Sequence, residues 1–326
     1  MAIHEIIDPR HRWLQGLSPT RETIVRDAIE HASATGDVPP LIRIAAIDSI
    51  PLSDPNCIAV VQPSLHGVGF VVHAGCTGDA VLEDHPAGLV TAMRDRLREV
   101  CRDRGLGFIQ WATDVLESPS PQSHLPAQLG FERVGTLDYL SVDFPIRLPQ
   151  STPVTPDPVA AMVPLASDDA DEVARFNALV ARTYEGSLDC PTLESYRSVD
   201  QIIQGYRDNA TYSPDLWFTL VDAQRTVADG AKVHAPIGCL ILAKHSGGND
   251  TVMELVYMGV VPEARGRRCG ETIMHAIASM AEKCGAARLL LAVDRQNRPA
   301  SQLYQRLGMR RIFSETVWVQ SFEKTE

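Results

Sequence analysis

One stretch of the chain, residues 254–309, constrains the fold more than any other. Its letters read as an apolar strand, a short loop of arginine and glycine, an amphipathic helix, a second apolar strand and a further helix. The N–H groups that open a helix have no partner inside the helix, and the helix dipole places partial positive charge beside them. A strand that enters such a loop therefore predicts a binding site for an anion such as a pyrophosphate.

Length and composition limit the classes of protein to consider. The chain has 326 residues, a net charge of −11 and 44% hydrophobic residues, which suits two globular domains. The acidic balance argues against nucleic acid as a partner, because such a surface needs a concentrated basic face. No apolar run is long enough to span a bilayer, so we expect no membrane partner.

The spacing of the cysteines and histidines predicts whether the protein contains disulfides or a metal site. The seven cysteines form no close pair along the chain, and several lie within apolar runs, which is typical of reduced thiols. The ten histidines lack the spacing of metal ligands. We therefore expect a cytoplasmic protein without a bound metal, either a monomer or a homodimer.

Hydrophobic periodicity predicts helices and strands that alternate along both halves of the chain. Strands are expected at residues 41–48, 57–63, 68–75, 106–112 and 135–144, and again at 159–165, 216–223, 236–245, 251–261, 288–293 and 310–322. Helices are expected at residues 19–34, 87–104, 168–183, 192–208, 270–284 and 298–307.

A proline-rich segment separates the two halves. Five prolines between residues 145 and 158 cannot continue a helix or a central strand, so they predict a linker. We place a domain boundary near residue 152, which gives domains at 1–152 and 153–326.

The two halves repeat the same order of elements. A helix stops at Gly105 in the first half and at Gly285 in the second, 180 residues later. The letters QLGF at residues 128–131 answer RLGM at residues 306–309, an offset of 178 residues. Coincidence is the alternative, because glycine ends many helices. The two nearly equal offsets favour a duplicated domain.

Two motifs in the second half resemble the GCN5-related N-acetyltransferase (GNAT) superfamily. The letters VVPEARGRRCG at residues 260–270 are similar to the acetyl-CoA loop of that family, V-x-P-x-x-[RQ]-x-x-G-x-[GA]. The letters NRPASQLYQRLGM at residues 297–309 are similar to its N-x-x-A-x-x-x-Y-x-x-x-G-[FM] segment. The resemblance implies an α/β fold of two tandem GNAT-like domains, each with a mixed, mostly antiparallel sheet flanked by helices.

The resemblance assigns cofactor-binding roles to the loop and to the strand before it. In the family this strand splays from its neighbour, so Met258, Gly259 and Val260 would pair with the pantetheine and the thioester carbonyl. Gly259 would permit a β-bulge there. The alternatives are an ordinary paired strand and a solvated basic turn. The pyrophosphate of acetyl-CoA would be held by Arg265 and by the amides of Gly266, Arg267, Arg268, Cys269 and Gly270.

One position departs from the family pattern. Arg268 stands where the family has its first glycine, and a side chain there narrows the approach of the backbone to a phosphate. We expect a slightly reshaped loop, with the guanidinium available to the pyrophosphate or the 3′-phosphate. An alternative alignment to the motif, which starts at Arg267, would place Gly270 on a family glycine but would give the wrong spacing from Pro262. We therefore keep the alignment in which Arg268 occupies the position of the first glycine.

Two residues are expected to carry the acetyl transfer. Glu254 matches the glutamate that family members use as general base, and an apolar strand should raise its pKa. Because side chains alternate along a strand, we expect Glu254 on the same face as Met258 and Tyr257 on the other face. The alternative is that Glu254 faces outward. Tyr304 matches the tyrosine whose hydroxyl can protonate the departing thiolate, or it is a core aromatic. Asn297 would contact the cofactor or cap its helix.

The first half lacks these motifs. Its counterpart of the phosphate loop, near residues 85–90, has no arginine, and Glu83 and Asp84 would repel phosphate. We expect a degenerate first half and a working second half that transfers acetyl from acetyl-CoA to a small-molecule or peptide amine in a ternary complex. The region that usually shapes the acceptor pocket in the family, residues 184–217, holds aromatic and acidic residues to which no individual roles are assigned: Tyr184, Glu185, Asp189, Tyr206, Tyr212 and Trp217. The alternatives are a non-catalytic acetyl-CoA-binding or regulatory protein and a protein-interaction scaffold.

Overall fold

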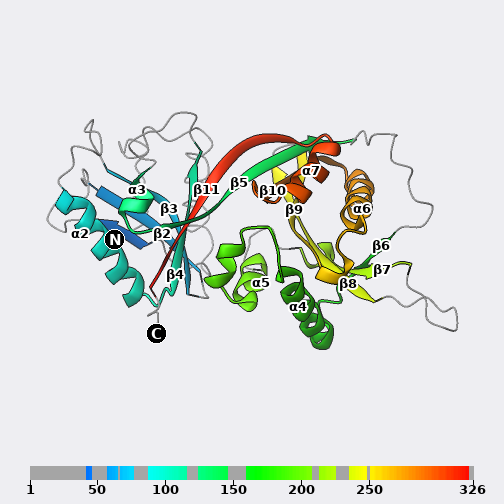
Figure 1. Ribbon diagram of the computed structural model, residues 1–326, viewed down its shortest axis with the longest axis horizontal. Coiled ribbons are helices and arrows are strands. Elements are labelled where there is room, and N and C mark those ends of the chain that lie inside the picture. Colours follow the sequence, from blue (N-terminus) through cyan, green and yellow to red (C-terminus); the bar gives the residue numbers. More distant parts are fainter. Residues whose placement is uncertain are drawn as a thin grey trace. The chain divides into compact units, whose positions relative to one another are not determined.

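The computed structural model describes residues 42–45, 57–64, 67–76, 87–115, 124–145, 159–207, 213–224, 235–247 and 250–322. Its sheet is mostly antiparallel and is flanked by helices, which confirms the predicted α/β class (Figure 1). The predicted helix at 19–34 and nearly all of the predicted linker lie outside the described residues. No helix of the described ranges is long and apolar enough to cross a membrane.

The chain divides into two compact units, Met1–Gly135 with Glu315–Glu326 and Thr136–Ser314. The first unit has the strand order β1-β2-β3-β4-β11, in which β3 and β4 alone are parallel neighbours. Helix α2 (Ala87–Asp103) and the short α3 (Leu125–Gln128) contribute to the core of this unit. The strands are β1 (Ile42–Ala45), β2 (Cys57–Pro63), β3 (Val68–Cys76), β4 (Phe108–Asp114) and the second part of β11 (Arg310–Ser321).

The second unit has the strand order β5-β10-β9-β8-β7-β6, in which β9 and β10 are the parallel pair. Its strands are β5 (Glu132–Asp143), β6 (Ala160–Pro164), β7 (Trp217–Asp222), β8 (Pro236–Gly247), β9 (Asp250–Val260) and β10 (Ala286–Asp294). Its helices are α4 (Ala170–Tyr184), α5 (Val199–Arg207), α6 (Cys269–Lys283) and α7 (Arg298–Arg306), with 3₁₀ turns η5 (Pro191–Ser195), η6 (Pro214–Leu216) and η7 (Pro262–Ala264).

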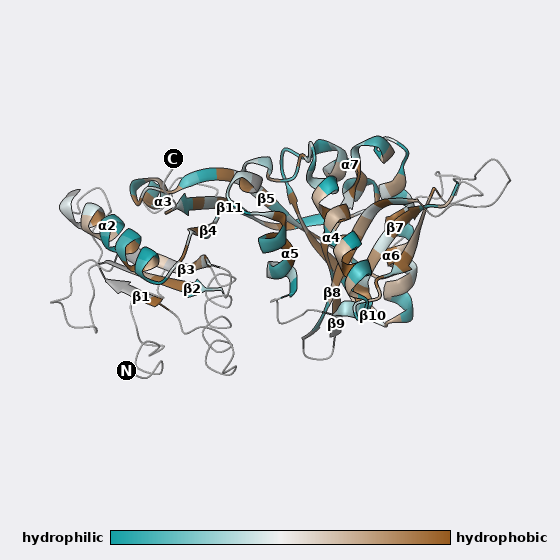
Figure 2. Ribbon diagram, turned by 90° about the horizontal axis from the view of Figure 1, so that it is seen from below, coloured by the Kyte–Doolittle hydropathy of each residue, from teal (hydrophilic) through white to brown (hydrophobic). Residues whose placement is uncertain are grey.

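Helices cover both faces of the second sheet. Apolar side chains of α6 and α7, such as Ile277 and Leu303, pack with Leu255 of β9 on one face. Phe176 of α4 and Ile203 of α5 pack on the other face. In Figure 2 the helix ribbons contain both hydrophobic (brown) and hydrophilic (teal) residues, as expected for amphipathic helices that pack on a sheet. Strands β8 and β9 contribute side chains to both cores and so lie between them.

The last strand of each half belongs to the other unit. Residues 137–143 of β5 pair with β10 of the second unit. Residues 315–321 of β11 pair with β4 of the first unit. The units therefore differ from the predicted division at residue 152, because the proline-rich segment marks a break in periodicity but carries no information on which sheet a strand joins.

The repeat of the sequence is also a repeat of backbone geometry. The parallel pair of the first unit ends at Val71 opposite Trp111, and a β-bulge follows at once at residue 72. The parallel pair of the second unit ends at Leu255 opposite Leu291, again followed by a bulge. The glycines that end the helices all have positive φ: +72° at Gly105, +66° at Gly285, +86° at Gly130 and +79° at Gly308. These coincidences argue for one ancestral unit present twice.

The helix predicted at 192–208 is two elements, η5 and α5. Ser198 caps the second of them: its hydroxyl accepts a bond from the Gln201 N–H (3.2 Å), and the Gln201 side chain accepts one from the Ser198 N–H (2.9 Å). This reciprocal capping box starts a new helix at Val199, which the apolar periodicity alone does not reveal.

Candidate functional site

A cavity of about 460 Å³ lies in the second unit where β9 and β10 separate. The two strands stop pairing after Leu255 and Leu291, although β9 continues to Val260 and β10 to Asp294. The splayed residues 256–260 line the cavity, together with the loop after α4, the loop before α6, and α7. This is the opened strand that the resemblance implies for residues 258–260.

The bulge in β9 lies at Val256 and not at Gly259. Tyr257 pairs with Ile241 and Leu255 pairs with Leu242, so residue 256 has no counterpart on β8. An added residue inverts the alternation of side chains beyond it.

This inversion separates Glu254 from Met258. Met258 packs with Leu255 in the core under α6, while Tyr257 packs in the core under α4 and α5. Glu254 precedes the bulge and alternates with Leu255, so it shares the α4–α5 face with Tyr257. The predicted grouping of Glu254 with Met258 is therefore wrong.

Gly259 marks a close approach of β9 to α4. A Cβ atom at this position would lie 2.4 Å from Oγ1 and 2.5 Å from Cβ of Thr183. Thr183 is buried, and its hydroxyl lies 2.9 Å from the Tyr257 hydroxyl. Only glycine leaves room for this contact, which sets the wall of the cavity.

The loop before α6 presents a row of free amides. Gly266 has φ +76° and Arg268 has φ +61°, which turns successive N–H groups toward one side. Within the described residues, the N–H groups of residues 266–270 donate to no other group of the chain. Five unpaired donors at the start of a helix form a site with the chemistry to hold a pyrophosphate.

The arginine side chains of this loop have different tasks. Arg265 donates to the carbonyl oxygens of Val260, Gly186 and Thr183, each at 3.0 Å, and so ties the loop to β9 and to the end of α4. Arg267 donates to the carboxylate of Asp222 at 2.8 Å, and this bond raises its pKa. The side chain predicted to hold pyrophosphate, Arg265, therefore positions the amides.

Arg268 is the cation of this loop that remains available. Its side chain is exposed and makes no hydrogen bond or ion pair with any described residue. Its left-handed backbone explains why the family has glycine here, since a side chain in this conformation costs about 1–2 kcal/mol. The arginine at the family's glycine position therefore strains the backbone of the loop.

Cys269 and Gly270 pack the loop against the core. Cys269 is 4% exposed, its Sγ lies 3.6 Å from the Ala264 carbonyl oxygen, and burial raises its pKa. A Cβ at Gly270 would lie 2.9 Å from the Leu303 side chain. The thiol fills space, and the glycine lets α6 approach α7.

Tyr304 is buried and lines the cavity. It is 6% exposed, and burial together with the charge of Asp189 raises its pKa above the ordinary tyrosine value. A hydroxyl that keeps its proton can deliver it to a thiolate. Asn297 lines the cavity and also caps α7, with Oδ1 accepting the Ala300 N–H at 3.3 Å. The cap that was expected as one of its two roles is therefore present, and contact with a cofactor stays a prediction.

Glu254 is not among the residues that line the cavity. Its Oε2 lies 2.5 Å from Nε2 of His245 on β8, and its side chain is 29% exposed. The surroundings are therefore not the apolar environment expected from the strand pattern. The structure brings Tyr304, Asn297 and residues 258–260 together and leaves Glu254 with a different partner.

Asp189 is the carboxylate that does line the cavity, a role that the sequence pattern did not single out. Its Oδ1 accepts the N–H of Asp294 at 2.8 Å, and Oδ2 of Asp294 accepts the N–H of Cys190 at 3.1 Å. Two carboxylates thus lock the loop after α4 to the end of β10. Only the tertiary fold joins residues so distant in the chain, so no local signal could have found the pair.

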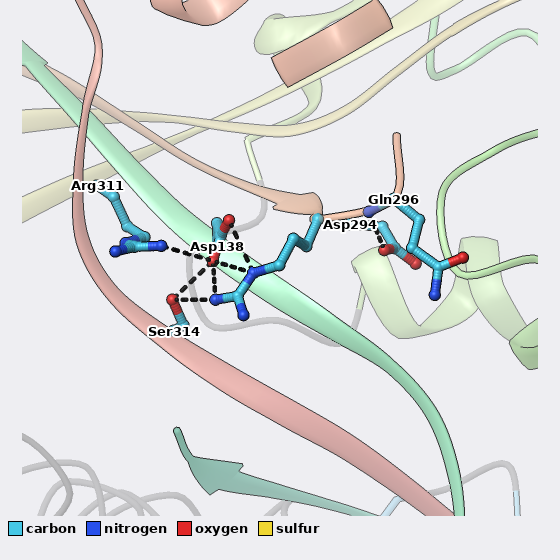
Figure 3. A network of polar contacts seen from close by, with 6 residues as sticks. Asp138, Asp294, Gln296, Arg311 and Ser314 are labelled. Carbon is cyan, nitrogen blue, oxygen red and sulfur yellow. Dashed lines mark hydrogen bonds and ion pairs between the residues drawn. The ribbon is translucent and has the colours of Figure 1, made fainter. Parts of the chain in front are cut away.

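A polar network supports the same end of β10. Asp138 of β5 accepts bonds from Arg295 (2.6 Å) and from Ser314 (2.6 Å), and Arg311 lies 3.9 Å away (Figure 3). Burial raises the pKa of Asp138, but these hydrogen bonds and the two arginine charges outweigh burial and lower it. Arg295 follows Asp294 directly, so the network fixes the strand end that holds Asp189.

Comparisons with known proteins agree on one family. A sequence model of the Acetyltransferase (GNAT) family matches residues 189–309. An uncharacterised N-acetyltransferase of Mycobacterium tuberculosis (strain ATCC 25618 / H37Rv) is 25% identical over 142 residues, 44% of this chain and 83% of the relative. A mycothiol acetyltransferase of Paenarthrobacter aurescens (strain TC1) is 26% identical over 266 residues, 78% of this chain and 74% of the relative.

A solved structure shares the fold. The crystal structure of a GCN5-related N-acetyltransferase from Sphaerobacter thermophilus matches with a TM-score of 0.53 and 15% sequence identity. The match covers 92% of this chain and 86% of that one.

Proposed function

We propose that this chain, a member of the GNAT superfamily and hence an acyltransferase, transfers acetyl from acetyl-CoA to a primary amine of a small molecule or peptide. One observation carries the proposal. The row of five unpaired amides at residues 266–270 begins at Gly266, which lines the same cavity as Tyr304. This geometry suits a pyrophosphate at the loop and a thioester near the tyrosine.

Each part of the site has a task in this reaction. The amides of residues 266–270 bind the pyrophosphate, while Arg265 and Arg267 hold the loop in place. The edge of β9 that no longer pairs with β10, at residues 258–260, pairs with the pantetheine and polarises the thioester carbonyl, apart from the Val260 carbonyl oxygen, which Arg265 already occupies. Tyr304 donates a proton to the departing thiolate. We propose direct transfer from acetyl-CoA to the amine in a ternary complex, with both molecules bound in this cavity.

The first unit is proposed to be a degenerate copy that no longer binds the cofactor. Its counterpart of the phosphate loop, near residues 85–90, is described only from Ala87, where α2 begins, so the proposal rests on the letters of residues 83–90 and on the side chains compared below. We propose that the protein is cytoplasmic, because the proposed reaction needs acetyl-CoA, which is present in the cytosol.

A non-catalytic acetyl-CoA-binding protein is the second candidate. One observation favours it: Glu254, the residue that matches the family's general base, lies outside the cavity lining. Such a protein would bind the cofactor but release no thiol.

A single set of measurements separates these functions. Calorimetry should show that the protein binds acetyl-CoA, and a thiol-release assay over a panel of primary amines should show turnover with at least one. Binding without turnover would support the non-catalytic protein. If acetyl-CoA neither binds nor protects the protein from heat unfolding, both functions are wrong.

A further inference from the structure

The cavity wall contains a carboxylate with half of its bonding capacity unused. Asp189 is partly buried, and its Oδ1 is taken by the Asp294 N–H at 2.8 Å. Its own N–H donates to Oγ of Ser187 at 3.1 Å, which fixes the turn of the loop. No donor among the described residues reaches Oδ2. A carboxylate oxygen that faces a cavity without a partner is ready to accept a bond from a ligand.

No positive charge of the described chain compensates this carboxylate. None of the ion pairs in the described ranges includes Asp189. Arg265 lines the same cavity, but its guanidinium donates to the carbonyl oxygens of Gly186, Thr183 and Val260. An unpaired carboxylate in a cavity is costly unless a cation or a proton joins it.

The backbone around Asp189 is held under strain. Cys190 has φ +47°, and it is one of two non-glycine residues with positive φ in the described ranges; the other is Arg268. Both flank the cavity site, one beside the carboxylate and one in the amide loop. Such strain persists only where the surroundings enforce it, and here the carboxylate of Asp294 holds the Cys190 N–H (Figure 3 shows Asp294 at the strand end).

We propose that Asp189 binds the protonated amine of the acceptor in this cavity, which Tyr304 also lines, and accepts one of its protons. This role rests on the proposed acetyl transfer and replaces Glu254 as the proton acceptor. The proton moves from the ammonium nitrogen to Oδ2 of Asp189, and the neutral amine keeps the lone pair that attacks the thioester carbonyl. The acceptor class is therefore a cationic primary amine.

The groups around Asp189 favour this proton transfer. The titratable groups that face it are Asp294 of β10, Tyr304 of α7, Tyr257 of β9 and Cys190 of its own loop. None of them is positively charged at neutral pH. Burial raises the pKa of Asp189, the Asp294 N–H lowers it, the Asp294 charge raises it, and the net shift is upward. A base with a raised pKa is better matched to an ammonium.

The test compares Asp189→Asn with a matched control variant in the full chain. Asn keeps an oxygen for the Asp294 N–H but cannot accept a proton. We expect kcat/KM for the amine to fall roughly 100-fold or more, while the Kd for acetyl-CoA stays within about threefold of wild type. The rise of kcat/KM on the acid side of the pH profile should disappear. Glu185→Gln removes an exposed carboxylate of the same loop and should leave all of these unchanged.

Thermal unfolding gives a readout that does not depend on activity. Because the pKa of Asp189 is raised in the folded state, its charged form destabilises the fold at pH values above that pKa. Asp189→Asn should therefore melt at a higher temperature than wild type at pH 8, with the difference shrinking as the pH falls. A lower melting temperature at pH 8 together with an unchanged pH profile of kcat/KM would assign a purely structural role and overturn the proposal.

The remaining outcomes are decisive as well. If Asp189→Asn keeps the kcat/KM and the pH profile of the wild type, or if Glu254→Gln takes the loss instead, Asp189 is not the proton acceptor although the protein is an acetyltransferase. If wild-type protein does not bind acetyl-CoA, the proposed function fails, and the role of Asp189 fails with it.

Discussion

Both units contain a parallel strand pair that opens beside a β-bulge, yet the site is built in one of them. The first unit opens after Val71 and Trp111, and the second after Leu255 and Leu291. By this register Phe70, which is 39% exposed, stands where the second unit has Glu254. The separation of the two parallel strands is thus a property of the backbone, because it is present in both units although Phe70 in the first unit takes the place of Glu254 in the second.

The tyrosine position shows the same separation of backbone and chemistry. In the first unit the Phe131 N–H donates to the Pro126 carbonyl oxygen at 2.9 Å, and in the second the Met309 N–H donates to that of Tyr304 at 3.1 Å. The turn is conserved between the units, but proline has no hydroxyl to give a proton. Function in this fold therefore depends on a few side chains placed on a backbone that both units share.

The largest expected effect comes from removing the hydroxyl that distinguishes these two positions. Tyr304→Phe should lower kcat about 100-fold, because the thiolate loses its proton donor, while acetyl-CoA affinity changes little. A thiol-release assay measures kcat, and calorimetry measures the affinity for acetyl-CoA. Tyr139→Phe, which removes a hydroxyl from a ring stacked on Phe313, is the matched control and should retain full activity. Unchanged kcat in Tyr304→Phe would make the two units equivalent at this position.

A second expected effect concerns the wall of the cavity. Gly259→Ala places a Cβ 2.5 Å from Cβ of Thr183, so β9 or α4 must shift. We expect a loss of about 1–3 kcal/mol in the free energy of unfolding, and weaker acetyl-CoA binding. Chemical denaturation measures the first quantity. Gly205→Ala in α5 meets nothing within 4 Å and should instead stabilise the helix by about 0.5–1 kcal/mol. Equal effects of the two substitutions would contradict the close approach.

The comparison also explains what the letters could predict. Periodicity placed most elements within one to three residues, and β2 at residues 57–63 coincides with its expectation. The amide loop was predictable because glycines and a helix start are local features. The exchange of β5 and β11, the bulge at Val256 and the pairing of Asp189 with Asp294 all depend on which residues meet across the sheet. Arg265 shows the limit of such predictions: its place in the motif is local, but its carbonyl partners Gly186 and Thr183 lie 79 and 82 residues earlier in the chain.

A smaller effect is expected where β5 enters the second unit. Asp138→Asn removes the carboxylate that joins Arg295 and Ser314, and should cost on the order of 1 kcal/mol of stability at pH 7. Folding lowers the pKa of Asp138. The carboxylate therefore stabilises the fold at pH values above its pKa in the unfolded chain, about 4, and this stabilisation is lost as the pH falls through the lower pKa of the folded state. Melting curves from pH 7 to pH 3 should therefore converge. A constant difference between variant and wild type would show that the charge is not responsible.

The smallest expected effect tests the residue that departs from the family motif. Arg268→Gly relieves a left-handed backbone at φ +61° and should stabilise the second unit by about 1 kcal/mol. The same change removes the exposed guanidinium, so acetyl-CoA affinity should fall slightly at low salt and be unchanged at high salt. Arg268→Asn tolerates the left-handed conformation without the charge, and Arg268→Lys keeps the charge without relieving the strain. If the affinity follows the charge and the stability follows the conformation across these variants, Arg268 serves the cofactor at a cost to the fold; if Arg268→Gly destabilises the protein, the left-handed backbone is not strained.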